Sequence, residues 1–323
     1  MNHKTFIKFA SYLRRIYPLK VREELYATFN TDFKGQYANE LIKNILLDDK
    51  PAMIARFGNS ELQTLVNYLE ITESKFTKYY KYITYQSNNL EWKRHNIELL
   101  TVNAGFFPDT PEHIEKYCKA FIDDISKIDI LGSWLESEKK VEKFYSENLK
   151  TVGFADLEPY YHQKPWTKAL EGKNVLVIHP FEDSIIKQYE KRKFLFKDPN
   201  VLPSFNLKTI KSVQTIAGNN QEKYRDWFHA LDIMKEQMEK TDFDIALIGC
   251  GAYGLPLAAH AKKIGKKGFH LGGATQVLFG IIGDRWLNSG GYKNFNFHNE
   301  HWIRPSKDET PKNSDKIEGA TYW

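Results

Sequence analysis

The feature that most constrains the fold of this chain is a pattern of strand, glycine turn, helix and strand between residues 243 and 286. Its first apolar run is too short for an ordinary helix and ends in a glycine turn, which is typical of a buried strand. Such a unit favours a parallel sheet, and open parallel sheets bind ligands at these turns. The parts are strands 245–248 and 268–271, helix 255–263, turn glycines Gly249, Gly251 and Gly254, and the later pair Gly272 and Gly273.

The three turn glycines have the spacing G-x-G-x-x-G, which is the dinucleotide-binding fingerprint. Pro256, however, lies in the first helical turn, and position 272, where an acidic ribose-binding residue is expected, is glycine. The fingerprint keeps an NAD(P)-dependent oxidoreductase as one alternative, and a tight connection without a ligand as another. If a ligand binds, the glycines let its phosphate approach the backbone, and the helix N-terminus favours its negative charge.

Composition places the chain of 323 residues among globular proteins, since 41% of the residues are apolar and 14% are aromatic. The net charge is +5, and the charged residues are scattered along the chain. This distribution suits anionic small ligands and does not indicate nucleic-acid binding. Cys118 and Cys250 lie far apart and lack metal-ligand spacing. We therefore expect a cytoplasmic protein.

The start of the chain predicts a short basic amphipathic helix. Its apolar side holds Phe6, Phe9, Leu13 and Ile16, and cations lie elsewhere on the helix at Lys8, Arg14 and Arg15. Packing against the body of the protein is the favoured interpretation. Peripheral docking on the inner face of a membrane is the alternative.

Further strands are predicted at 52–56, 129–134 and 175–179, and they alternate with helical patterns. The expected fold class is therefore α/β, a Rossmann-like and mainly parallel sheet flanked by helices. We divide the chain into a helical N-terminal segment (1–48), a Rossmann-like domain (49–290) and a C-terminal tail (291–323) that packs on the domain.

Small polar clusters follow four of the predicted strands, at 56–61, 133–134, 179–184 and 249–254, and the last is continued by 270–276. The carboxyl ends of parallel strands share one edge of a sheet, so these clusters are expected to meet in one crevice. That convergence predicts an active site, although no single cluster would.

The first cluster places Arg56 at a strand end and Glu61 at a helix start. Arginine binds phosphate through a two-pronged fork, and a carboxylate holds a divalent cation or a sugar hydroxyl, with Asn59 adding a carbonyl. The structural alternative is that Asn59 or Ser60 caps the helix while Glu61 complements its dipole.

The other clusters contribute histidines. His179 ends its strand and is a candidate general base or phosphate donor, with a hydrogen-bonded core histidine as the alternative. Asp183 is another candidate base, and Ser184 either binds phosphate or caps the following helix. His270 ends the last strand beside a glycine pair, which favours a ligand there, with Gln276 and Arg285 downstream.

Absent motifs narrow the function. The chain contains no G-x-x-x-x-G-K-[ST] loop, no G-x-S-x-G elbow and no H-E-x-x-H helix, so P-loop ATPases, serine hydrolases and zinc proteases lose support.

Several motifs resemble a known family. The segments RFGNSEL (56–62), VLVIHPFEDSI (175–185), IGCGAYG (248–254) and HLGG (270–273), followed by GDRW (283–286), are similar to the bacterial glycosyltransferases of the GT-D fold. That family was first catalogued as a domain of unknown function and occurs in polysaccharide and glycoprotein assembly clusters. The resemblance covers about residues 50–290. It implies transfer of a sugar from a nucleotide-sugar donor to a glycan or lipid-linked glycan acceptor.

The resemblance also implies roles for individual residues. The family pattern has Asp-x-Glu near a divalent metal; here the first position is Asn59, so Glu61 and Asn59 would form only a weak Mg²⁺ or Mn²⁺ site. A non-catalytic glycan- or nucleotide-binding relic is therefore a further alternative. The expected catalytic residues are Glu61, His179, Asp183 and His270. The expected donor-binding residues are Arg56, Gly58, Asn59, Ser60, Ser184, Gly249, Gly251, Tyr253, Gly254, Gly272, Gly273, Gln276 and Arg285.

Overall fold

The computed structural model describes residues 3–17, 30–288, 292, 298–317 and 319–323. Within them, seven strands form one all-parallel sheet in the order β3-β2-β1-β7-β6-β4-β5. The predicted α/β, Rossmann-like fold is confirmed. The strands are β1 (Ala52–Ala55), β2 (Ile130–Ser133), β3 (Lys150–Gly153), β4 (Asn174–His179), β5 (Asn206–Lys211), β6 (Ile245–Ile248) and β7 (Lys267–His270).

Sequence patterns predict the five inner strands and miss β3 and β5, which are the two edges of the sheet. The four residues of β1, β2 and β6 are all buried, whereas β3 and β5 each bury one residue. An edge strand has neighbours on one side only and tolerates polar side chains, so it shows no apolar run.

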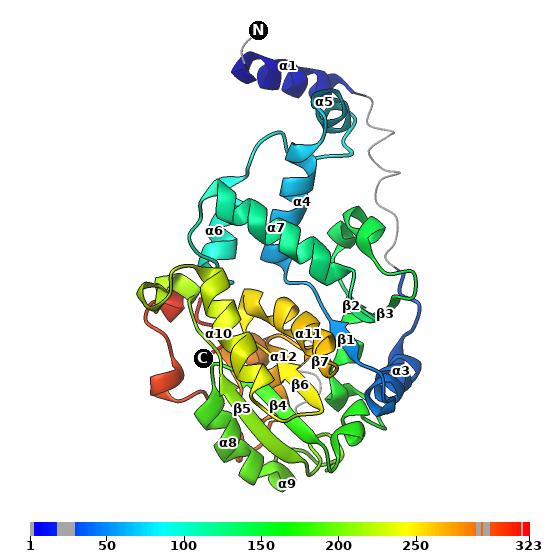
Figure 1. Ribbon diagram of the computed structural model, residues 1–323, viewed down its shortest axis with the longest axis vertical. Helices are drawn as coiled ribbons and strands as arrows, with labels where there is room; N and C mark the ends of the chain where they lie inside the picture. Colours follow the sequence, from blue (N-terminus) through cyan, green and yellow to red (C-terminus); the bar gives the residue numbers. More distant parts are fainter. Residues whose placement is uncertain (1–2, 18–29, 289–291, 293–297, 318) are drawn as a thin grey trace.

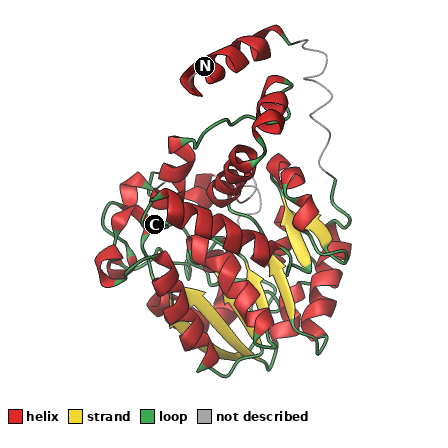
Figure 2. Cartoon of the chain, turned by 45° about the horizontal axis from the view of Figure 1, so that its top comes forward, coloured by secondary structure: helices red, strands yellow, loops and turns green. Residues whose placement is uncertain are grey.

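Helices cover both faces of the sheet (Figure 2). One face carries α4 (Asn59–Thr72), α6 (Arg94–Val102), α7 (Pro111–Ile125), α10 (Trp227–Glu239) and α11 (Gly254–Lys263), which pack with Met53 and Ala55 of β1. The other carries α3 (Gly35–Leu47), α8 (Glu182–Glu190), α9 (Arg192–Leu195) and α12 (Ala274–Leu278), which pack with Ile54. Successive residues of a strand point to opposite faces, and this alternation explains the two cores.

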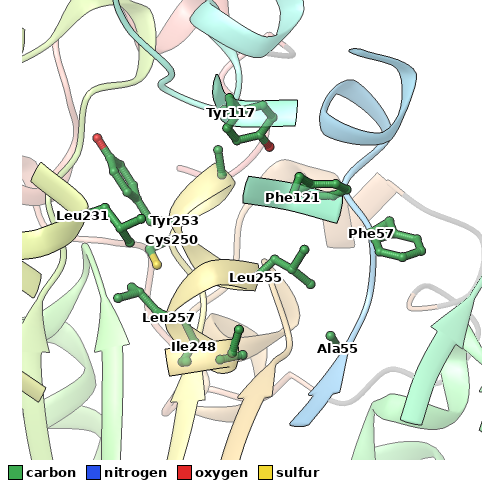
Figure 3. Close-up of a cluster of buried hydrophobic side chains, with 14 of the residues drawn as sticks. Ala55, Phe57, Tyr117, Phe121, Leu231, Ile248, Cys250, Tyr253, Leu255 and Leu257 are labelled. Atoms are coloured by element: carbon green, nitrogen blue, oxygen red, sulfur yellow. The ribbon is translucent and has the colours of Figure 1, made fainter. Parts of the chain in front are cut away.

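The central helix α11 lies directly on the sheet. Figure 3 shows Leu255 and Leu257 of α11 in one apolar cluster with Ile248 of β6 and Ala55 of β1. At Gly268 of β7, an added Cβ would lie 2.3 Å from the carbonyl oxygen of Ala258. The helix backbone therefore reaches the strand only because residue 268 is glycine.

The N-terminal segment contacts two separate parts of the protein. Helix α1 (His3–Ile16) lies against α5 (Lys75–Ile83) at one end of the molecule (Figure 1), and α3 packs beside the sheet. The predicted apolar side of α1 faces inward only in part: the Phe6 ring contacts Tyr79 of α5, whereas Phe9 and Ile16 are exposed. Instead Arg14 turns inward and donates to the carbonyls of Tyr82 and Ser87, both at 2.6 Å.

Residues 298–317 and 319–323 pack on the domain. Ile303 pairs with Ile281, Arg304 forms an ion pair with Asp284 of α13 (Asp284–Asn288), and the Trp302 indole donates to the Leu195 carbonyl at 2.8 Å. The boundary at residues 290 and 291 lies outside the described residues, and so does part of segment 1–48. The three-part division of the chain stays a prediction.

The contact at Gly268 gives a test of the fold. Gly268→Ala should lower the free energy of unfolding by about 2–3 kcal/mol, because the new methyl group overlaps the α11 backbone. Urea unfolding measures the change. Gly172→Ala is the matched control: its Cβ would meet open space, and only the left-handed backbone (φ 72°) costs about 1 kcal/mol. Equal losses in both variants would contradict the packing argument.

Candidate functional site

A cavity of about 320 Å³ opens at the carboxyl edge of the sheet, where β1, β7, β6 and β4 end side by side. The expected convergence of strand ends is therefore observed. The predicted site residues that line it are Arg56, Gly58, Asn59, Ser60, Glu61, His179, Gly249, Gly251, Tyr253, His270, Gly272, Gly273, Gln276 and Arg285.

Arg56 follows β1 and is the central cation of the cavity. Its guanidinium lies over the rings of Trp134 and Phe154, with its central carbon 5.6 and 5.3 Å from the ring centres. Burial lowers its pKa from the ordinary value, and the nearby Tyr322 and Glu61 oppose that shift. Its buried Nε has no hydrogen-bond partner among the described residues. A desolvated cation in this state is a strong site for an anion.

Glu61 is buried in the first turn of α4 and accepts a hydrogen bond from the Ser60 hydroxyl at 3.0 Å. Its carboxylate folds back over Gly58, where an added Cβ would lie 2.1 Å from Oε2. The helix begins after Gly58 without a side-chain cap, so neither Asn59 nor Ser60 has the capping role of the structural alternative. The N-terminus of α4 therefore faces the cavity together with a carboxylate.

His179 ends β4 and is held as a neutral ring. The backbone N–H of Phe181 donates to its Nδ1 at 3.0 Å, which assigns the ring proton to Nε2. Burial lowers the pKa of His179 to about 3. A ring with this pKa presents an N–H donor to a ligand and is a weak proton acceptor at neutral pH.

His270 ends β7 and lies under the first turn of α11. An added Cβ at Gly254 would lie 2.1 Å from its Nδ1, so the glycine makes room for the ring. Burial, with a further contribution from Arg56, lowers the pKa of His270 to about 3. Its Nδ1 is buried without a partner among the described residues. A neutral ring beside Arg56 adds no competing positive charge.

Each of the three glycines of the fingerprint makes room for another part of the protein or adopts a backbone conformation that favours glycine. An added Cβ at Gly249 would lie 2.5 Å from the Gly272 carbonyl oxygen, and Gly254 accommodates His270. Gly251 has φ 57°, a left-handed conformation that favours glycine, and it approaches Ala104. Packing at the strand ends therefore requires these glycines, and Gly249 and Gly251 also line the cavity.

Two chain segments distant in sequence close the cavity. Arg285 donates to the Tyr322 hydroxyl at 2.6 Å, and the Gln276 amide donates to the Tyr322 carbonyl at 3.2 Å. Gly273 adjoins the Tyr322 ring, which an added Cβ would approach to 3.0 Å. Gln276 is therefore a buried support for the wall that Tyr322 and Trp323 form.

Three predicted site residues lie outside the cavity wall. Asp183 is exposed and pairs with Lys211 at 3.3 Å. Ser184 is buried and donates through its hydroxyl to the Glu309 carboxylate, which also accepts the Ser184 N–H at 3.1 Å. Gly254 lies behind the His270 ring. A carboxylate from the C-terminal segment thus occupies the position where Ser184 was expected to bind phosphate.

Sequence reasoning missed several parts of the wall. The segment 212–216 follows the unpredicted strand β5, and it includes Ser212, whose buried hydroxyl has no partner among the described residues. No alternating apolar pattern marks β5, because its two apolar residues, Leu207 and Ile210, lie three positions apart. Residues 103–104 and the chain end (Ile317, Tyr322 and Trp323) reach the site only through folding, and nothing local in their sequence indicates it.

The charges and donors of the wall suit an organic anion better than a metal. Among the described lining residues, the charged ones are Arg56, Glu61 and Arg285. No three or more His, Cys, Asp or Glu side chains in the described part of the chain gather closely enough to hold a metal ion. One carboxylate and the Asn59 amide do not match the roughly six oxygens of a Mg²⁺ site.

Comparison of the chain with protein-family models, with curated proteins and with solved structures gives no match. No helix in the described ranges combines the length and the apolar character required to cross a membrane.

The buried histidines give a pH test. Both have a native pKa of about 3 against an ordinary 6.5, so between these values the unfolded chain binds protons that the native protein does not. The native state therefore loses stability as pH falls below 6.5, by about 1.4 kcal/mol per pH unit for each ring. Urea unfolding between pH 6.5 and about pH 5 measures this slope.

Replacing one of the two buried histidines measures its contribution to the pH dependence of stability. His270→Gln should reduce the slope by about 1.4 kcal/mol per pH unit, because the variant lacks the ring that the unfolded chain protonates. An unaltered slope in His270→Gln would mean that the His270 ring is protonated in the native protein.

Proposed function

We propose that the protein is a glycosyltransferase that moves a sugar from a nucleotide-sugar donor to a glycan acceptor in bacterial surface polysaccharide or glycoprotein synthesis. The observation that carries the proposal is the buried Arg56 guanidinium with an unpartnered Nε at the cavity. Arginine in this state gains most from a phosphate, which accepts two of its hydrogen bonds at once. The motif resemblance supports a nucleoside diphosphate as that anion.

Departure of the nucleoside diphosphate is the step that such a site must assist. Negative charge grows on the diphosphate as the bond to the sugar breaks, and cations placed beforehand stabilise it. Arg56 and Arg285 line the same cavity, and the charge of Arg285 adds to the lowering of the Arg56 pKa that burial causes. The uncapped N-terminus of α4 adds backbone N–H groups at the same place.

Glu61 is the candidate base of the proposed reaction. A base that takes the acceptor proton must lie in the cavity, within hydrogen-bond reach of the acceptor. His179 and His270, with pKa values of about 3, are poorly suited, and Asp183 lies outside the cavity. Glu61 is the carboxylate among the described lining residues, and its second candidate role is to hold a sugar hydroxyl.

A second hollow marks a path for the acceptor. It measures about 700 Å³, and Trp134 lines both this groove and the cavity. Its wall carries polar side chains such as Gln63, Asn89 and Lys139. An exposed aromatic ring beside hydrogen-bonding groups is suited to a sugar, so we assign the glycan or lipid-linked glycan acceptor to this side.

We also propose a cytoplasmic location, where nucleotide sugars would be the available donors. Cys118 and Cys250 are both free and buried, and burial raises the pKa of both thiols above the ordinary value. Such thiols are unreactive and suit a reducing compartment.

A ligand panel tests the proposal. Thermal shifts with UDP- and GDP-sugars should exceed those with NAD(H) or NADP(H), and one or more nucleotide sugars should release free nucleoside diphosphate. Stabilisation by NAD(P) alone would favour an oxidoreductase. Binding of a nucleotide sugar without any release over hours would indicate a binding protein that has lost catalysis.

Glu61→Gln should lower sugar transfer by roughly a hundredfold or more while the fold stays intact, because the variant cannot take a proton or carry the charge. Glu112→Gln is the matched control: it removes a carboxylate from the first turn of α7, another helix N-terminus, away from the cavity. Initial rates of transfer and circular dichroism are the measurements. Normal turnover in folded Glu61→Gln would remove Glu61 from the site.

Arg56→Met should abolish binding of a nucleoside diphosphate without lowering the melting temperature. The variant removes a desolvated cation from an apolar setting, so the free protein loses little stability and can gain some. Titration calorimetry with UDP and GDP and a thermal scan give the two values. Retained affinity, or a large fall in melting temperature, would mean that Arg56 serves the fold instead.

A further inference from the structure

We propose that the outward face of α1 docks on an anionic membrane surface. Phe9, Tyr12 and Ile16 of this helix are exposed by 53%, 60% and 61%. Their spacing of three and four residues places them on one side of the helix. A helix of 14 residues thus presents an apolar stripe to its surroundings.

The stripe faces outward because the opposite side of α1 is already anchored. Arg14 donates to two carbonyls and to the Asn88 side chain, and the Tyr85 hydroxyl donates to the Arg14 carbonyl at 2.7 Å. Ala10 is buried, and the Phe6 ring contacts that of Tyr79 on α5. These contacts fix the rotation of the helix, so the exposed stripe is a property of the folded protein.

Cations border the stripe. Lys8 and Arg15 are exposed, and helical spacing puts them together on the flank of the stripe beside Tyr12. Helices α1 and α5 together contain seven Lys and Arg residues and no Asp or Glu. That charge exceeds the +5 of the whole chain, so the rest of the protein is net acidic. Aromatic side chains beside cations are the pattern of a helix that lies in the headgroup region of anionic lipids.

The charge also favours a membrane over a second copy of this chain. A two-fold interface through this face would bring the same Lys and Arg residues of both copies together, and like charges repel. Helix α5 carries two further exposed aromatic side chains, Phe76 and Tyr80, whose ring centres lie 6.4 Å apart. Its neighbour Glu73 is paired with Lys81 and leaves the remaining cations in excess.

Vesicle co-sedimentation tests the docking. The full chain should bind vesicles of equal parts phosphatidylcholine and phosphatidylglycerol and should not bind phosphatidylcholine alone. High salt should weaken binding, since the screening length falls from about 10 Å at 0.1 M to about 3 Å at 1 M. Binding requires no catalysis, so the outcome is independent of the proposed reaction.

Two paired substitutions locate the surface. Phe9→Ser with Tyr12→Ser, and Lys8→Glu with Arg15→Glu, should each lower the vesicle affinity by about tenfold or more. Phe194→Ser is the matched control, since Phe194 is equally exposed (60%) on α9 and should leave binding unchanged. Circular dichroism checks that each variant is folded.

Three outcomes would overturn the proposal: no binding to the anionic vesicles, equal binding by the paired variants, or equal loss in Phe194→Ser. Light scattering measures the molar mass and so tests the alternative that a second copy of the chain binds this face. A dimer that disappears in the Phe9→Ser, Tyr12→Ser variant, without vesicle binding by the unaltered chain, would make this face a contact between copies.

Discussion

The close packing of α11 on β7 is the contact on which the site depends. Gly268 lets the helix backbone reach the strand, and the buried residues of α11 then fill the core between the sheet, α7 and α10. With the helix at this depth, its first turn lies over His270, and the glycine turn that precedes it forms one wall of the cavity. The packing of α11 on the sheet therefore also sets the geometry of the site.

Burial and charge at Arg56 set the electrostatics of the cavity. Burial of Arg56 is unfavourable for the folded protein, and two aromatic rings, Tyr322 and the carboxylates of Glu61 and Glu158 offset only part of this cost. The two histidines stay neutral beside it, so the positive charge is not duplicated in the interior. A site that holds an unsatisfied cation stores affinity for an anion, at some expense of stability in the free state.

The C-terminal segment does more than cover the domain. Glu309 caps α8 through Ser184, and Tyr322 joins Arg285 and Gln276 at the cavity wall. The same residue types would have allowed Ser184 and Arg285 to meet a phosphate directly. Their partners in the folded protein give Ser184 a structural role and give Arg285 a position that Tyr322 supports.

By itself, the sequence determined the parallel α/β fold, the five inner strands and the crevice where Arg56, Glu61, His179 and His270 meet. These follow from local apolar runs and from the shared edge of parallel strands, which any such sheet must have. Tertiary structure alone decided the edge strands β3 and β5, the capture of Ser184 by Glu309 and the outward stripe of α1. Each of these depends on a partner far away in the chain, and a partner's position is a property of the packed protein that no local pattern encodes.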